Sequence, residues 1–315
     1  MPSREAVINP QPSPSDITVF APAKINVILR ILGRRPDGFH NLWSIMQTVA
    51  LEDEVEIRLR ADRQDIQLRC DATQLAADQS NLVYRAATVV LARAQQSIGL
   101  DIELRKRIPM GAGLGGGSSD AAATIIGLSH LLQLEWSPTQ MADVGQLLGS
   151  DVPFFLFAPS AFVAGRGETV RPVVVDGVRW VVLVNPGFGV NTKWAYQELA
   201  ATRTAVTPLS LVQRELDRQL RVSWAQLIAA AENDFEAPVF AAHGKLREIK
   251  RTLQACGAEI TLLSGSGATV FGVFADEARA RQAQAQFVNE NLMNVFLAPT
   301  CSGPLGWRSG LPDKP

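Results

Sequence analysis

Apolar and polar positions alternate along much of the chain, a pattern typical of strands that are buried on one face. From Leu100 to Ile108 the sequence reads Leu-Asp-Ile-Glu-Leu-Arg-Lys-Arg-Ile, with apolar and charged residues mostly taking turns. A period of two predicts a half-buried, antiparallel strand. The same pattern, or a short β-branched apolar run, predicts further strands at residues 20–32, 53–59, 66–70, 161–175, 180–184, 260–274 and 294–298.

Segments of helical composition lie between these strands. The clearest is the alanine-rich, apolar run from Ala121 to about Leu132. Further helices are expected at residues 81–98, 138–148, 194–199, 224–232, 242–256 and 276–289. Strand clusters with helices between them, in which most strands keep one polar face, predict an α+β fold.

The length of 315 residues is enough for a large core and for two domains. We expect a disordered lead-in rich in Pro and Ser at residues 1–16 and a tail at 308–315. Between them we expect an N-terminal domain at 17–172 and a C-terminal domain at 173–307.

Composition excludes some classes of partner. The formal net charge is −1, so nothing attracts the whole chain to nucleic acid or to an anionic membrane, and no apolar run approaches transmembrane length. The three cysteines, Cys70, Cys256 and Cys301, match neither a disulfide framework nor a metal-ligand spacing. This favours a reducing, cytoplasmic compartment.

The strongest indication of function is a glycine-rich loop, which continues directly into the alanine-rich helix. Glycines let a ligand approach the backbone N–H groups, and a helix N-terminus attracts anions, so the loop predicts a phosphate site. Ser118 and Ser119 add hydroxyl donors and are expected to cap the helix. A flexible Gly-Ser linker would not normally continue into an apolar helix. The predicted phosphate-binding residues are Pro109, Met110, Gly111, Ala112, Gly113, Leu114, Gly115, Gly116, Gly117, Ser118 and Ser119.

The segment before the glycine loop indicates which type of phosphate-binding loop this is. Gly111-x-Gly113-x-x-Gly116 formally matches the dinucleotide fingerprint, which leaves NAD-dependent oxidoreduction as an alternative. That fingerprint follows a buried parallel strand, whereas the strand predicted here alternates. The Walker A pattern fails as well, because no Lys-Ser/Thr pair closes the loop. A kinase nucleotide loop of a third kind fits best.

Three segments in order carry a resemblance to a known family: Ala21-Pro22-Ala23-Lys24-Ile25-Asn26, the glycine loop, and Leu263-Ser264-Gly265-Ser266-Gly267-Ala268. Together they resemble the GHMP superfamily of galactokinase, homoserine kinase, mevalonate kinase and phosphomevalonate kinase. The similarity runs from about Val19 to about Leu305. It implies a two-lobed fold with the active site in the cleft between the lobes, ATP on the glycine loop, and Mg²⁺ on the phosphates.

Two more segments are similar to one branch of the superfamily, whose small-molecule substrate carries a cytidine diphosphate group in the non-mevalonate isoprenoid pathway. They are the turn Asp37-Gly38-Phe39-His40 and Gly149-Ser150-Asp151-Val152-Pro153. The resemblance implies that Asp151 is the general base for the substrate hydroxyl and that Lys24 orients it. Asn26 then positions the same hydroxyl. Without the resemblance, Asp151 is more simply a turn residue.

The same resemblance implies a platform for the cytosine ring. Phe39 stacks on the base, at a position where relatives usually carry Tyr, and His40 donates a hydrogen bond to it. Tyr196 is the second aromatic side chain, with Trp194 as the alternative, and Thr192 contacts the substrate. Gly265, Ser266 and Gly267 close the cleft, although alone they also fit a tight hairpin.

Several other residues are interpreted from their local sequence. A period of two puts Lys24, Asn26 and Ile28 on one face of their strand and Ile25, Val27 and Leu29 on the other. Asn233-Asp234-Phe235-Glu236 resembles a second-lobe segment of the family and is interpreted as a helix start. His130 and His243 are expected to be structural. The sequence has no dedicated carboxylate cluster for a metal, so Ser118 or Ser119 with water are the candidates for holding Mg²⁺.

Two other functions stay open at this point. One is a different kinase of the superfamily, for which mevalonate or homoserine is the acceptor. The other is a nucleotide-binding regulator without catalytic activity. The sequence is compatible with a monomer or a homodimer.

Overall fold

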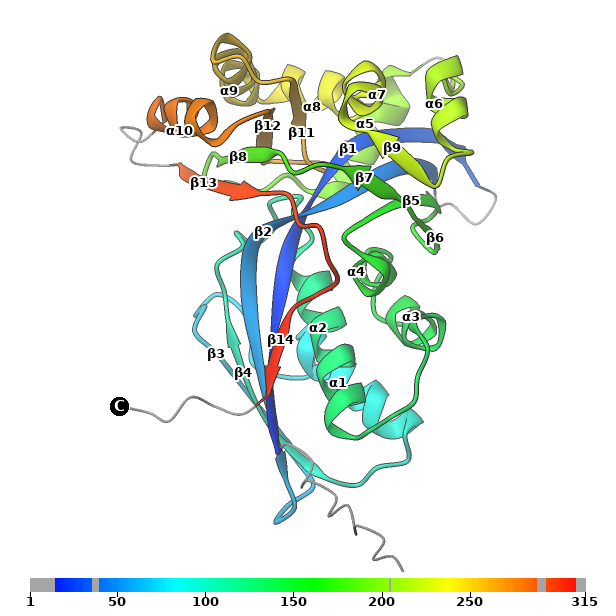
Figure 1. Ribbon diagram of the computed structural model, residues 1–315, viewed down its shortest axis with the longest axis vertical. Coiled ribbons are helices and arrows are strands. Elements are labelled where there is room, and N and C mark those ends of the chain that lie inside the picture. Colours follow the sequence, from blue (N-terminus) through cyan, green and yellow to red (C-terminus); the bar gives the residue numbers. More distant parts are fainter. Residues whose placement is uncertain (1–14, 36–39, 204, 288–292, 310–315) are drawn as a thin grey trace, which may run out of the picture.

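Two long strands join two lobes in the computed structural model, which describes residues 15–35, 40–203, 205–287 and 293–309 (Figure 1). Strands β1 (Asp16–Arg34) and β2 (His40–Arg60) pair antiparallel and pass from the lower lobe into the upper one. The strands predicted at residues 20–32 and 53–59 are therefore parts of longer strands. Residues 1–14, 36–39 and 310–315, which include Phe39 and most of the expected lead-in, turn and tail, lie outside the described residues.

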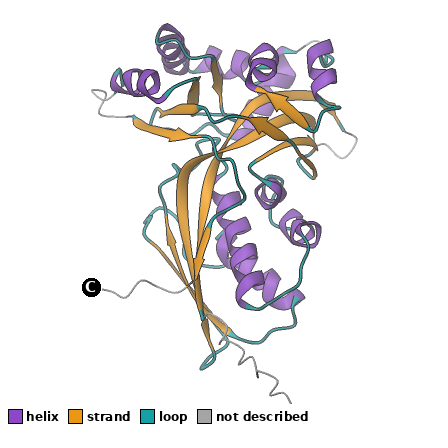
Figure 2. Cartoon of the chain, viewed as in Figure 1, coloured by secondary structure: helices purple, strands orange, loops and turns teal. Residues whose placement is uncertain are grey.

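The lower lobe packs helices against one face of a sheet (Figure 2). Along the sheet the strand order is β10-β1-β2-β4-β3, and β4 pairs antiparallel with β2, as the alternation predicted. This mixed pairing does not fit a dinucleotide-binding sheet. The elements of this lobe after β2 are β3 (Ile66–Cys70), α1 (Leu82–Arg93), β4 (Gly99–Arg105), α2 (Gly116–Leu131), α3 (Pro138–Gln146) and α4 (Val152–Phe157). The same sheet continues upward: β5 (Ser160–Gly165) pairs with the upper end of β2 and with β6 (Thr169–Pro172), beside β7 (Val174–Asp176) and β9 (Arg221–Ser223) (Figure 1).

The upper lobe is built on a second sheet with the order β11-β12-β8-β13. Its elements are β7 (Val174–Asp176), β8 (Trp180–Asn185), α5 (Thr192–Thr202), α6 (Leu211–Leu216), β9 (Arg221–Ser223), α7 (Trp224–Ala230), β10 (Glu232–Asn233), α8 (Glu236–Ala242), α9 (Gly244–Ala255), β11 (Ile260–Leu263), β12 (Val270–Phe274), α10 (Glu277–Ala285) and β13 (Asn294–Pro299). The α+β class is confirmed. Helices α4 and α6 were not predicted, because six residues carry too little periodicity. The helix start expected at Asn233-Asp234-Phe235-Glu236 is where α8 begins.

The chain returns to the lower lobe at its end. Strand β14 (Trp307–Ser309) pairs antiparallel with Ile17–Val19 of β1, so the last described segment lies beside the first (Figure 1). No helix in the described ranges has both the length and the apolar character needed to cross a membrane.

A β-bulge in β1 changes the predicted alternation. The register with β2 shifts between Asn26 and Ile28, and Ile28 lies in the same apolar cluster as Ile25 and Val27. The prediction that Ile28 shares a face with Lys24 and Asn26 was therefore wrong, because a bulge puts an extra residue into one strand and ends the strict period of two. Lys24 and Asn26 do share a face, since the Lys24 ammonium donates to Asn26 Oδ1 at 2.6 Å.

A buried group of three titratable side chains fixes both ends of the glycine loop. Asp53 on β2 accepts hydrogen bonds from the backbone N–H groups of Arg107 and Ile108, where the loop begins. Lys106 donates to Asp53 and, at 2.6 Å, to Asp120 on α2, where the loop has ended. Burial raises the pKa of Asp120 from 3.8 to about 8, which outweighs the lowering by the Lys106 ammonium.

The raised pKa of Asp120 makes stability depend on pH. Folding takes up a proton between about pH 4 and pH 8, so this group's contribution to stability is complete below about pH 4 and is lost as the pH rises through 8. In urea unfolding, the stability of the wild type relative to Asp120→Asn should fall across this range, by at most about 1.4 kcal/mol per pH unit. The matched control is Glu135→Gln at an exposed position, for which we expect a flat difference. A flat difference for Asp120→Asn as well would contradict the assignment.

Candidate active site

The glycine loop leaves the start of α2 without a side-chain cap. The N-cap residue is Gly115, whose φ of 73° is in the left-handed region that favours glycine, and no side chain caps the helix. Ser118 and Ser119 lie inside the first turn, where the Ser119 N–H already donates to the Gly115 carbonyl at 2.9 Å. The prediction that these serines cap the helix was therefore wrong. The first N–H groups of α2 are available to an anionic ligand instead.

A groove of about 390 Å³ follows this loop. Its walls come from the loop, from the start of α1 and from the charged group beneath the loop. Ser118 lines the groove, whereas Ser119 is fully buried. The lining residues are Leu75, Ser80, Asn81, Leu82, Lys106, Ile108, Pro109, Met110, Gly111, Ala112, Gly113, Leu114, Gly115, Gly116, Gly117, Ser118 and Asp120.

The loop at Ser264–Gly267 packs against the back of the glycine loop. Ser264 Oγ donates to the Gly113 carbonyl at 2.9 Å, and the Thr269 N–H donates to the Ala112 carbonyl at 3.2 Å. Gly113 has a φ of 77°, and a Cβ at this position would overlap the carbonyl oxygen of Ser264. Only a glycine allows the two loops to approach this closely.

Lys24, Asn26 and Asp151 meet beside these loops. Lys24 is buried on β1, and its ammonium lies 3.5 Å from Asp151 Oδ2. Asp151 precedes the short helix α4, but its carboxylate does not cap that helix and is one-third exposed. Asn26 Oδ1 accepts the Lys24 ammonium and also the Gly265 N–H, the latter at 3.0 Å. The amide of Asn26 donates to Ser44 Oγ at 2.9 Å, which fixes its orientation.

A second cavity, of about 640 Å³, opens on the other side of Asp151. The rings of His40 and Tyr196 stack there with centroids 4.7 Å apart and planes 20° apart. Trp194 packs against His243 instead and does not line this cavity. The described lining residues are His40, Leu42, Ser150, Asp151, Arg166, Thr192, Lys193, Tyr196, Gln197 and Ala200.

Two other side chains complete the description of this cavity. Thr192 Oγ1 lies 2.9 Å from Ser266 Oγ, which ties the cavity to the Ser264–Gly267 loop. Burial raises the pKa of Tyr196 to about 12, so its hydroxyl stays protonated at neutral pH. Sequence reasoning missed Arg166 and Lys193. The available signals were the two glycines that flank Arg166 in a hairpin and the position of Lys193 beside Thr192.

Lys24 lies between a residue of the glycine-loop groove and a residue of the second cavity. Gly115 of the nucleotide groove lies against the Lys24 side chain, where a Cβ would come within 3.0 Å of Lys24 Cγ. The Lys24 ammonium faces Asp151, which lines the second cavity. A phosphate on the glycine loop and an acceptor in the second cavity would therefore meet at a buried cation and a carboxylate. In the part of the chain that the structure describes, no group of three or more His, Cys, Asp or Glu side chains gathers as a metal site.

Comparisons with known proteins find relatives along most of this chain. The models of the GHMP kinase N-terminal domain and C-terminal domain match residues 81–158 and 212–292. A 4-diphosphocytidyl-2-C-methyl-D-erythritol kinase of Geobacter sp. (strain M21) is 41% identical over 86% of this chain and 94% of its own length. One of Syntrophotalea carbinolica is 40% identical over 92% of this chain and 96% of its own length.

The chain belongs to the 4-diphosphocytidyl-2-C-methyl-D-erythritol kinase family. A crystal structure of such a kinase superimposes with a TM-score of 0.73 at 30% identity, covering 91% of this chain and all of that one. Homoserine kinase from Cytophaga hutchinsonii reaches a TM-score of 0.74 at 19% identity, covering 96% of this chain and 99% of that one, which shows a shared fold only. The family membership makes this chain a small-molecule kinase of the GHMP superfamily, whose members use ATP.

The close approach of the two loops predicts a difference between two glycine variants of this kinase. Gly113→Ala should lower the free energy of unfolding by about 2–5 kcal/mol, because left-handed strain adds to a backbone overlap. Gly111→Ala is the matched control. It has a φ of 62° but nothing within 4 Å of an added Cβ, so we expect about 1–2 kcal/mol from strain alone. Urea unfolding measures both values, and equal losses would contradict the packing described here.

Proposed function

We propose that this kinase transfers the γ-phosphoryl group of ATP to the 2-hydroxyl of 4-diphosphocytidyl-2-C-methyl-D-erythritol, in the non-mevalonate isoprenoid pathway. The observation that carries the proposal is the position of Lys24, which lies against Gly115 of the nucleotide groove while its ammonium lies 3.5 Å from Asp151 of the second cavity. The names of the relatives support the choice of acceptor. Phosphoryl transfer depends mainly on positioning and on charge stabilisation, which a cation, a carboxylate and a phosphate loop supply.

In the proposed reaction, Asp151 receives the acceptor. The substrate hydroxyl donates a hydrogen bond to the Asp151 carboxylate, which takes the proton as the oxygen attacks the γ-phosphorus. The exposed part of the carboxylate faces the second cavity, from which the acceptor enters. Since Asp151 caps no helix, its oxygens are not committed to the protein backbone there.

Lys24 holds Asp151 in place and brings positive charge to the transferring group. Its ammonium is buried between Asn26 and Asp151, so water screens it little. A fixed cation in such a place stabilises negative charge that develops on the phosphoryl oxygens. Asn26 orients Lys24 and positions the acceptor hydroxyl.

The second cavity accommodates the cytidine diphosphate part of the acceptor. Tyr196 and His40 offer aromatic surface and polar edges to a pyrimidine, with Phe39 as the proposed stacking partner outside the described residues. Thr192 is proposed to contact the acceptor. Arg166 and Lys193 bring cationic side chains to the same cavity, which suits a diphosphate.

A magnesium ion fits this donor set as a companion of the nucleotide. Mg²⁺ prefers oxygen ligands and keeps several of them from water and substrate phosphates. The Ser118 hydroxyl lines the groove and is the side chain that would hold it. When bound, the ion neutralises charge on the β- and γ-phosphates.

Removing the carboxylate charge should slow the chemical step. We expect Asp151→Asn to lower kcat by about 100- to 10,000-fold, with a small change in the KM values, because proton acceptance is lost while binding remains. The assay couples ADP release from Mg-ATP with the cytidine acceptor. Asp143→Asn, at an exposed position on α3, is the control and should retain the wild-type rate. Wild-type turnover by Asp151→Asn would exclude the proposed base.

The acceptor is tested by comparing substrates. The wild type should turn over the cytidine compound and neither mevalonate, homoserine nor galactose. His40→Ala and Tyr196→Ala should each raise the KM for the acceptor by about 10-fold or more, because a stacking or hydrogen-bonding partner worth about 1.4 kcal/mol is lost. The KM for ATP is the internal control and should stay the same. Turnover of another acceptor, or an unchanged acceptor KM in both variants, would overturn the proposed specificity.

A further inference from the structure

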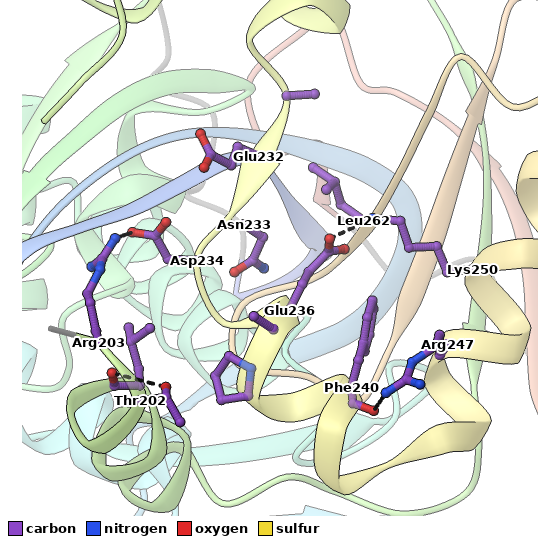
Figure 3. Close-up of a pocket in the computed structure, with 14 residues that line it drawn as sticks. Thr202, Arg203, Glu232, Asn233, Asp234, Glu236, Phe240, Arg247, Lys250 and Leu262 are labelled. Atoms are coloured by element: carbon purple, nitrogen blue, oxygen red, sulfur yellow. Dashed lines mark hydrogen bonds and ion pairs between the residues drawn. The ribbon is translucent and has the colours of Figure 1, made fainter. Parts of the chain in front are cut away.

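The segment Glu232–Glu236 contains side chains that the proposed chemistry does not use. It forms β10 and the start of α8, beside a surface groove of about 780 Å³ (Figure 3). Asp234 is turned toward Arg203, and Glu236 toward Lys250, as Figure 3 shows. These ion pairs lie on the groove side. Asn233 also lines the groove, but it is buried, and its amide bonds the backbone of the neighbouring strand end and loop.

Asn233 holds the chain on both sides of Ser264. Its amide nitrogen donates to the Leu263 carbonyl at 2.6 Å and to the Gly265 carbonyl at 2.8 Å. Its Oδ1 accepts the Phe235 N–H at 2.9 Å, which fixes the orientation of the amide. One nitrogen with two N–H groups can satisfy two carbonyls at once, and among short side chains only Asn provides this.

The backbone that Asn233 holds leads directly to the reacting groups. Gly265 donates its N–H to Asn26 Oδ1, and the same oxygen accepts the Lys24 ammonium, which faces Asp151. Ser264, between the two bonded carbonyls, donates to Gly113 of the nucleotide loop. Each link in this series is a hydrogen bond or ion pair of 3.5 Å or less.

We propose that Asn233 is a positioning residue for phosphoryl transfer. It fixes the backbone on both sides of the Ser264–Gly265 peptide, whose N–H bonds Asn26 Oδ1. Asn26 then presents this oxygen to Lys24, which sets the position of the Lys24 ammonium relative to Asp151 and the nucleotide. The inference rests on the proposed function and deepens it. Asn233 touches neither the nucleotide groove nor the acceptor cavity, so it acts through its neighbours.

Its neighbour Asp234 supplies a matched control. The side chain of Asp234 is largely buried as well, but it binds Arg30, Arg203 and the Ile31 N–H, which anchor the lobe rather than the Ser264–Gly267 loop. Loss of its charge should lower stability. It should leave the geometry of Asn26 and Lys24 intact, because none of its bonds reaches them.

The test compares Asn233→Asp with Asp234→Asn at a temperature well below both unfolding midpoints. Asn233→Asp keeps the shape of the side chain but turns an acceptor toward two carbonyls. We expect its kcat to fall by about 10- to 100-fold while the KM values for ATP and acceptor change by less than about threefold, since a small misplacement of the reacting groups has this effect. Asp234→Asn should lower the melting temperature at least as much and keep kcat within about twofold of the wild type.

A second variant covers the case in which Asn233→Asp does not fold. Asn233→Ala removes the two hydrogen bonds without adding charge and should show the same loss of kcat in protein that circular dichroism shows to be folded. A kcat near that of the wild type in the folded Asn233 variants would overturn the inference, and so would equal losses in Asn233 and Asp234 variants. Absence of turnover in the wild type would instead overturn the proposed function.

Discussion

The contact between the glycine loop and the Ser264–Gly267 loop is the constraint on which the site depends. The two segments are about 150 residues apart in the sequence, yet Ser264 Oγ donates to the Gly113 carbonyl, and the Ser264 carbonyl oxygen leaves no space for a Cβ at position 113. This contact fixes the phosphate-binding backbone to the loop that also bonds Asn26. The contact between these two loops therefore sets the position of the glycine-loop groove relative to Asn26 and Lys24.

Long strands and buried polar side chains hold the two lobes around that contact. Strand β1 carries Lys24 and Asn26 in its middle and continues into the upper lobe, where Arg30 bonds Asp234 and Glu232. The group formed by Asp53, Lys106 and Asp120 holds the glycine loop at both ends. Buried ion pairs contribute little net stability, but they define a unique arrangement when every partner is in place. Here the arrangement is that of a loop that leaves the start of α2 without a side-chain cap.

Prediction from the sequence worked where a pattern was long or a motif was specific. The alternation before the glycine loop predicted the antiparallel strand β4, and the alanine-rich run predicted α2. It failed where a backbone detail decided the outcome. The bulge after Asn26 puts Ile28 on the opposite face of the strand from Lys24 and Asn26. The N-cap of α2 is the left-handed Gly115 and neither serine. Neither a bulge nor a left-handed N-cap leaves a periodic signal, because each concerns a single residue.

The sequence by itself predicted the kind of chemistry, since a glycine loop before an apolar helix is typical of a phosphate site. It also determined the family, through motifs that keep their order along the chain. Only the tertiary structure decided which side chains meet. Lys24 and Asp151 are 127 residues apart (151 − 24), and Asn233 reaches the Gly265 carbonyl from a strand that pairs with β1. A local sequence pattern contains no information about such long-range contacts, because the packing of the whole chain sets the distances between segments.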